Sequence, residues 1–252
     1  MSRRGEGTPS VCPYISVFPV GDVVVLGIET ATDVCSVGIV RGGAVLAAAH
    51  VAVPRSHATR LALLVQETLA HARLTPADLD AVAVSAGPGS YTGLRIGASL
   101  ARGLSLATGA ALVGVGTLDA LAAGAQPLLR EHETLVVALP SRRGEVYLSV
   151  FSAEVRVVEA RAVALADVAA VVAASVAAGT PDGPIAVAGA ATDAVAAALG
   201  EAGYAVRAVG VGPSAVLTAR LGAALHASGL GAAPVTFEPS YLGSFATTPP
   251  RA

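Results

Sequence analysis

The sequence contains no lysine, so all 16 of its basic residues are arginines. Schiff-base enzymes, pyridoxal phosphate enzymes and Walker-type phosphate loops each need a lysine amine at a fixed position, so the chain belongs to none of these classes. Tryptophan is also absent, and aromatic residues make up only 4% of the chain. Because alanine and valine supply most of the apolar residues, the core must close through tight packing of small side chains.

Cysteine and histidine are scarce as well. The two cysteines, Cys12 and Cys35, are too few for a disulfide framework or a zinc cluster; this favours a reducing compartment, and we expect a cytoplasmic protein. The five histidines show no HxxxH or HExxH spacing, and no GxSxG motif marks a nucleophilic serine. We therefore expect no metal site and no catalytic residues, and a peptidase is the least favoured function.

Long apolar runs and excess charge are missing too. No charge-free stretch reaches the roughly 18 residues of a spanning helix, so we expect no membrane partner. The formal net charge is only -2, so any contact with RNA would need a partner protein. Residues 1–22, with an arginine pair and three prolines, predict a disordered extension.

Two regions of the chain repeat one order of elements. Residues 23–130 predict three strands, a helix, a strand, a helix, a strand and a helix, and residues 131–252 repeat that order. This doubled order resembles the actin/Hsp70-like (ASKHA) architecture, in which two α/β lobes of ribonuclease H-like fold face each other across a cleft; the resemblance is one of fold and implies no activity. We expect the last helix, residues 213–228, to pack back on the first lobe. In the first helix, residues 56–73, apolar residues recur at spacings of three and four, and Ser56 is the expected N-cap.

The most specific segment is SAGPGSYTGLRIG, residues 85–97, which joins a predicted strand to a helix predicted over 93–108. Its glycines let backbone N–H groups converge at a helix N-terminus, an arrangement that suits a phosphate or carboxylate. The alternative is a tight strand-to-helix turn without a ligand. The residues of the predicted anion or nucleotide site are Glu29, Gly87, Gly89, Ser90, Thr92 and Arg95.

Glu29 ends the first predicted strand, where it either approaches a metal and phosphates or caps the turn that follows. The corresponding turn of the second half, residues 140–145, lacks an acidic residue at its strand end, which argues against phosphoryl transfer. Small residues recur every four positions along the helix over 93–108, and either the chain's own sheet or a partner helix packs on this ridge. The ridge residues are Gly93, Gly97, Ala101, Ser105 and Gly109.

Three segments resemble the TsaB (YeaZ-type) family of bacterial tRNA threonylcarbamoyladenosine biosynthesis proteins, once grouped with glycoproteases. They are VLGIETATDVCSVGIV, RSHATRLALLV and, most specifically, SAGPGSYTGLRIGASLARGL. The similarity is close from about residue 24 to residue 121 and looser afterwards, where RRGEVYLSVF and EPSYL still match. Two positions depart from the family pattern and bear on nucleotide affinity and on the tail: Pro140, where members usually have Asp, and Gly243, where they usually have Arg.

The resemblance implies a non-catalytic scaffold that pairs through its first-lobe helices with the metal-binding paralogue TsaD, a pair that the TsaE ATPase joins. The complex transfers a threonylcarbamoyl group to the adenosine beside the anticodon of ANN-reading tRNAs. Alone, the chain would form a homodimer; it would need no cofactor, with weak ATP or ADP binding only in the composite complex. The alternative is a stand-alone ATPase or small-molecule kinase of this fold. The residues expected at the partner interface are His57, Arg60, Leu61, Leu64, Thr68, Gly93, Gly97, Ala101 and Ser105.

Overall fold

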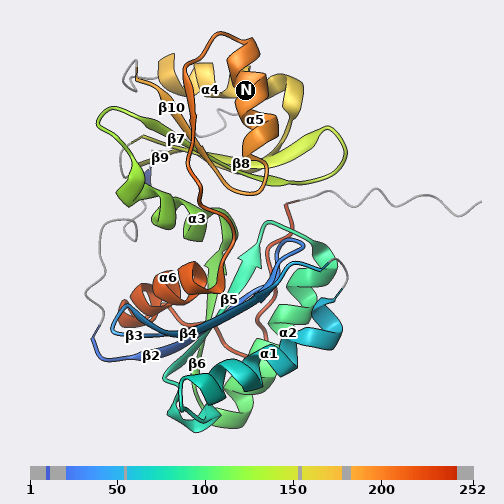
Figure 1. The fold of residues 1–252 in the computed structure, drawn as a ribbon, viewed down its shortest axis with the longest axis vertical. Coiled ribbons are helices and arrows are strands. Elements are labelled where there is room, and N and C mark those ends of the chain that lie inside the picture. Colours follow the sequence, from blue (N-terminus) through green and yellow to red (C-terminus); the bar gives the residue numbers. More distant parts are fainter. Residues whose placement is uncertain (1–9, 12–20, 54–55, 153–154, 178–182, 243–252) are drawn as a thin grey trace, which may run out of the picture.

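The computed structural model describes residues 10–11, 21–53, 56–152, 155–177 and 183–242, which form two α/β lobes (Figure 1). The first lobe comprises β2 (Val24–Glu29), β3 (Cys35–Arg41), β4 (Ala44–Val51), α1 (His57–His71), β5 (Ala81–Gly87), α2 (Tyr91–Thr108) and β6 (Ala111–Gly116), followed by α3 (Thr117–Ala125). The second comprises β7 (Thr134–Pro140), β8 (Glu145–Ser152), β9 (Val155–Ala164), α4 (Val168–Ala177), β10 (Ile185–Ala188), α5 (Thr192–Glu201) and β11 (Val206–Ala208), followed by α6 (Ala215–Ala227). Single 3-10 turns lie at Pro76–Asp78, Gln126–Leu128 and Leu165–Asp167.

The two sheets share one strand order, which confirms the predicted duplication. The first sheet runs β4-β3-β2-β5-β6 and the second β9-β8-β7-β10-β11, with β1 (Ser10–Val11) added beside β9. In each lobe the first three strands are antiparallel and the later ones join in parallel. The actin-like fold predicted from the order of elements is therefore correct.

Both faces of the central strands of the first sheet are buried, whereas the edge strand β4 is largely exposed. Leu26 and Val84 face α1 and α2, whereas Val25 and Ala83 face α6 on the opposite side. Glycine at position 27 of β2 lets α6 approach closely, because a Cβ there would overlap with the Ala215 carbonyl oxygen.

Helices α3 and α6 join the lobes, because each packs on the sheet of the other half of the chain. Although α6 ends the second half of the chain, it packs on the first sheet; α3, which ends the first half, contributes Leu118 and Leu121 to a core with Leu135 and Phe151 of the second lobe. The side chains of Arg156 on β9 and Asp119 on α3 form an ion pair. The inner helices therefore fix the two lobes against each other.

Two expectations need correction, and a third holds only in part. The extension predicted to be disordered pairs with β9 at Ser10–Val11, because the outer edge of β9 offers free N–H and C=O groups; residues 1–9 and 12–20, with Cys12, lie outside the described residues. Ser56 is the N-cap residue of α1, as predicted, but its side chain makes no capping hydrogen bond, because its hydroxyl donates to the Val53 carbonyl. Helix α2 begins at Tyr91, two residues before the predicted start. None of the helices in the described ranges is long and apolar enough to span a membrane.

Candidate functional site: an interlobe cavity and a helix groove

The glycine-rich turn packs on the segment that follows β2. Gly87 ends β5 with a φ of 106°, and a Cβ at Gly89 would overlap with the Ala31 carbonyl oxygen. The Ser90 N–H donates to that carbonyl at 2.7 Å, and the Ser90 hydroxyl accepts the Gly93 N–H at 3.3 Å as the N-cap of α2. Two of the amides expected to face an anion are therefore used within the lobe.

The residues predicted for the anion site do not lie together: Glu29 is buried beneath the turn, and others line two separate surfaces. Gly89 and Ser90 line a cavity between the lobes, whereas Thr92 and Arg95 line a separate groove on the outer side of α2. The Arg95 guanidinium donates to the Tyr91 hydroxyl at 3.1 Å and lies 5.4 Å from the centre of its ring. The structure therefore does not bring these four residues to one surface, because one helical turn separates them.

Glu29 lies beneath the turn and is only 1% exposed. Its carboxylate accepts the Ala31 N–H at 2.7 Å and the Thr218 hydroxyl of α6 at 3.3 Å. Burial raises the pKa of Glu29 to about 7, although these hydrogen bonds oppose the shift. Of the two interpretations of Glu29, the structure supports the one in which its carboxylate caps the turn after β2. The same carboxylate also contacts α6 through Thr218.

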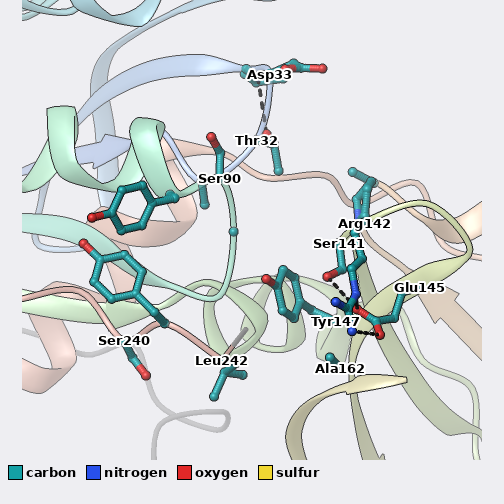
Figure 2. A pocket seen from close by; sticks show the side chains of 17 residues that line it. Thr32, Asp33, Ser90, Ser141, Arg142, Glu145, Tyr147, Ala162, Ser240 and Leu242 are labelled. Carbon is teal, nitrogen blue, oxygen red and sulfur yellow. Dashed lines mark hydrogen bonds and ion pairs between the residues drawn. The ribbon is translucent and has the colours of Figure 1, made fainter. Parts of the chain in front are cut away.

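The interlobe cavity has a volume of about 770 Å³ and is lined by the turns that follow β2 and β7 and by residues 240–242. Its charged lining residues are Asp33, Arg142 and Glu145. Figure 2 shows Arg142 paired with Glu145, at 2.8 and 3.0 Å, beside Ser141, whose hydroxyl lies 3.3 Å from the same carboxylate. Arg142 holds the pKa of Glu145 below its ordinary value.

Sequence reasoning missed two features of this cavity. It noted no acid at the end of β7, yet Glu145 at the start of β8 reaches the same turn, where Arg142 neutralises it. It also missed Tyr91, Tyr147 and Tyr241 as lining residues, three of the five tyrosines of the chain. The three-residue spacing of Arg142 and Glu145 could have predicted their ion pair. The contact between Tyr91 and Tyr241 could not be predicted in this way, because the two residues are far apart in sequence.

An apolar groove of about 630 Å³ runs between α1 and α2 on the outside of the first lobe. Its floor is formed by small and aliphatic side chains, and Tyr91 and Arg95 stand at one end. Ala62 on α1 and Ser99 on α2 are small, exposed residues of this groove. The lining residues are Ala58, Leu61, Ala62, Tyr91, Thr92, Arg95, Ile96, Ser99 and Leu100.

Most of the residues predicted for the partner interface face the chain's own core instead. Of those on α1, only Arg60 is exposed, and Leu61 alone lines the groove while being 2% exposed. The small ridge of α2 is sealed as well, since a Cβ at Gly93 or Gly97 would overlap with Thr30. The buried residues are His57, Leu64, Thr68, Gly93, Gly97, Ala101 and Ser105. The ridge is small because α2 crosses the β2 turn closely, so the surface open to a partner is the groove one helix face away.

A metal site is not evident in the described part of the chain, where no three His, Cys, Asp or Glu side chains are placed to hold an ion. Gly243 lies outside the described residues, and Pro140 lines the cavity at the end of β7. The cavity thus offers hydroxyls, tyrosine rings and a neutralised ion pair, while the groove offers an apolar surface.

A family model described as TsaD, tRNA N6-adenosine threonylcarbamoyltransferase, matches residues 51–234. The chain is 40% identical over 124 residues to the tRNA threonylcarbamoyladenosine biosynthesis protein TsaB of Escherichia coli, covering 49% of this chain and 52% of that protein. It is 44% identical over 146 residues to an uncharacterized protein of Mycobacterium tuberculosis, covering 57% of this chain and 66% of the relative. The matches thus span between half and two thirds of these relatives.

Solved structures match over more of the chain. A Pseudomonas aeruginosa protein described as similar to peptidase YEAZ has a TM-score of 0.69 at 25% identity, covering 88% of this chain and 100% of that one. The activator of the 2-hydroxyisocaproyl-CoA dehydratase from Clostridium difficile, with bound ADPNP, has a TM-score of 0.51 at 11% identity, covering 82% and 96%. The second likeness is one of fold alone, and it agrees with the strand order described above.

Proposed function

The chain belongs to the family of TsaD, tRNA N6-adenosine threonylcarbamoyltransferase, and within it to the TsaB (YeaZ) type; on this premise we propose that it is a non-catalytic scaffold subunit in threonylcarbamoyladenosine formation on tRNA. It binds TsaD, TsaE joins the pair, and tRNA is reached only through the complex. The product is the modified adenosine beside the anticodon of ANN-reading tRNAs. The chain needs no cofactor of its own, and it acts in the cytoplasm.

The groove between α1 and α2 is the observation that carries this proposal. It joins an apolar floor to a Tyr91 side chain that is 42% exposed and to an exposed Arg95. Tyrosine and arginine are enriched among residues that dominate binding energy, and an uncovered apolar patch is costly in water. We place TsaD in this groove, and a second copy of the chain in the same groove when TsaD is absent.

The acidic groups of the two lobes support a role without catalysis. Glu29 is sealed beneath its turn, and Glu145 is bound by Arg142. A phosphotransferase needs carboxylates from both lobes that hold a metal against the nucleotide; with Glu29 and Glu145 engaged, Asp33 of the first lobe is the remaining acidic side chain among the described lining residues, and the second lobe contributes no other.

The experiment is complex formation with TsaD from the same cell, followed by size-exclusion chromatography. The wild-type chain is expected to form a one-to-one complex. Ser99→Arg places a bulky charge in the groove and should abolish the complex, whereas Ala197→Arg, on the exposed side of α5, should leave it intact. If the wild-type chain forms no complex, or if both variants bind equally well, the proposal is wrong.

The rival function, a stand-alone ATPase or kinase, predicts magnesium-dependent turnover by the purified chain that disappears in Glu29→Ala. On our proposal the chain alone shows no such turnover. Measuring phosphate release without TsaD separates the two functions directly.

A further inference from the structure

The chain that follows α6 returns across the first lobe and is held there at several points (Figure 1). Ala232 pairs with Leu112 at the free edge of β6, its N–H donating to the Leu112 carbonyl at 2.8 Å. The ring of Phe237 covers Gly114, where a Cβ would lie 2.6 Å from the ring. Residues 230–242 are therefore an ordered part of the first lobe, although they come last in the described sequence.

Two further contacts lead this segment to the head of α2. The Arg102 guanidinium of α2 donates to the Val235 carbonyl at 2.9 Å. The Ser240 N–H donates to the Ala86 carbonyl at 2.7 Å, directly before the glycine-rich turn. These contacts bring the next residue, Tyr241, to the first residue of α2.

Tyr241 stacks there on Tyr91, with ring centres 4.9 Å apart and planes inclined by 49°. Tyr91 in turn carries the Arg95 guanidinium over its ring. Tyr241, Tyr91 and Arg95 thus form a row of three side chains; Tyr91 and Arg95 line the end of the groove, and Tyr241 lies behind them in the interlobe cavity. Tyr91 lines both the groove and the interlobe cavity, so this row also separates the two spaces.

We propose that Tyr241 is a positioning residue of the docking surface: by stacking on Tyr91 it fixes the aromatic end of the α1–α2 groove, and through Tyr91 it fixes Arg95. The inference rests on the proposed docking function. A tyrosine at a helix start that is 42% exposed has rotamer freedom to lose when a partner binds. A ring held beforehand loses less, so the stack increases affinity without touching the partner's core contacts.

The binding experiment compares three variants of the full chain for affinity to TsaD. Tyr241→Leu removes the ring and should weaken binding about three- to ten-fold, the range that a lost ring pair implies. Tyr241→Phe keeps the ring and should bind like the wild type. Leu242→Ala, one residue further along, should also bind normally. Unchanged affinity in Tyr241→Leu, or equal weakening in Leu242→Ala, overturns the inference.

A second measurement needs no partner. In protein labelled with 3-fluorotyrosine, the fluorine resonance of position 91, assigned with Tyr91→Phe, should move in Tyr241→Leu and stay in Leu242→Ala, while thermal unfolding shows that both variants fold. An unmoved resonance overturns the positioning role even if TsaD binds. A wild-type chain that fails to bind TsaD instead overturns the proposed function, whatever the resonance does.

Discussion

The two lobes share a strand order but differ in the helices that cover their outer faces. On α1 and α2, Leu63, Tyr91 and Leu106 are large apolar or aromatic side chains that remain exposed. The described side chains of α4 and α5 expose no large apolar residue, since Val172, Val195 and Leu199 are all buried. Duplication thus preserves the sheets, whereas the exposed apolar side chains gather in one helical layer, the layer in which we propose that TsaD docks.

The largest effect should come from filling the inner face of α2. Gly97 is packed against Thr30, so Gly97→Glu forces a buried charge into a space without room for a Cβ. We expect the free energy of unfolding to fall by more than about 4 kcal/mol, which abolishes folding of the first lobe. Thermal unfolding followed by circular dichroism measures the loss. The matched change in the other lobe is Gly200→Glu on α5, where the space is open, and it should leave the melting temperature nearly unchanged.

The same substitution also tests the sequence-based alternative in which a partner helix packs on the small ridge of α2. If the ridge were a partner surface, Gly97→Glu would weaken association and leave the fold intact. A folded Gly97→Glu variant with lost binding would therefore restore the ridge as the interface and refute the inward packing of α2.

The next largest effect concerns the pH dependence of stability, and it distinguishes the buried Glu29 of the first lobe from Glu145 of the second. Burial raises the pKa of Glu29 from 4.5 to about 7, so the folded chain retains a proton that the unfolded chain releases. The contribution of Glu29 to the free energy of unfolding is therefore fully present below pH 4.5, and it is lost as the pH rises through about 7. Glu29→Gln removes this loss, and we expect it to raise the free energy of unfolding by up to about 3 kcal/mol at pH 8.

The control for Glu29 is pH itself. Denaturant titrations of the wild type and of Glu29→Gln should give a difference that shrinks toward zero near pH 5. In the second lobe, Glu145→Gln should show no gain at pH 8, because Arg142 lowers the pKa of that carboxyl. A difference between the wild type and Glu29→Gln that is independent of pH would contradict the assignment.

A smaller effect compares two ion pairs within the second lobe. Glu133 is fully buried and accepts from Arg207 at 2.7 Å, whereas the Arg142 side chain is 67% exposed. Arg207→Met leaves the Glu133 carboxylate buried without its partner and should cost about 2 kcal/mol at pH 7. Arg142→Met should cost much less, because its ion pair with Glu145 is exposed to solvent.

The cost of Arg207→Met should depend on pH, because the ion pair requires an ionised Glu133. Arg207 lowers the pKa of Glu133, so the stabilisation is present above about pH 4.5 and is lost as the pH falls further. The cost of Arg207→Met, measured by urea unfolding, should therefore decrease in acid. Equal costs for both arginine variants at pH 7 would show that the burial of Glu133 has no energetic weight.

The order of elements was predictable because it depends on local patterns. Strands buried on both faces appear as apolar runs, and the glycine turn marks the start of α2. The site was less predictable, because small residues every four positions define a helix face but not its neighbour. The neighbour of that face, Thr30, precedes α2 by about 60 residues, and Tyr241 follows Tyr91 by 150. Such contacts arise only when the sheet is assembled.

The smallest expected effect tests the outer face of α2. Gly103 lies in the middle of the helix, is exposed, and would meet nothing with an added Cβ. Because glycine is a poor helix former, Gly103→Ala should raise the free energy of unfolding by about 0.5–1 kcal/mol. Gly103 lies four residues beyond Ser99, so the added methyl group should also lower the affinity for TsaD, by no more than about three-fold. Stability and affinity would then move in opposite directions at Gly103, whereas at Gly97 both would fall together. A variant that is more stable and binds TsaD as the wild type does would limit the docking surface to the groove before residue 103.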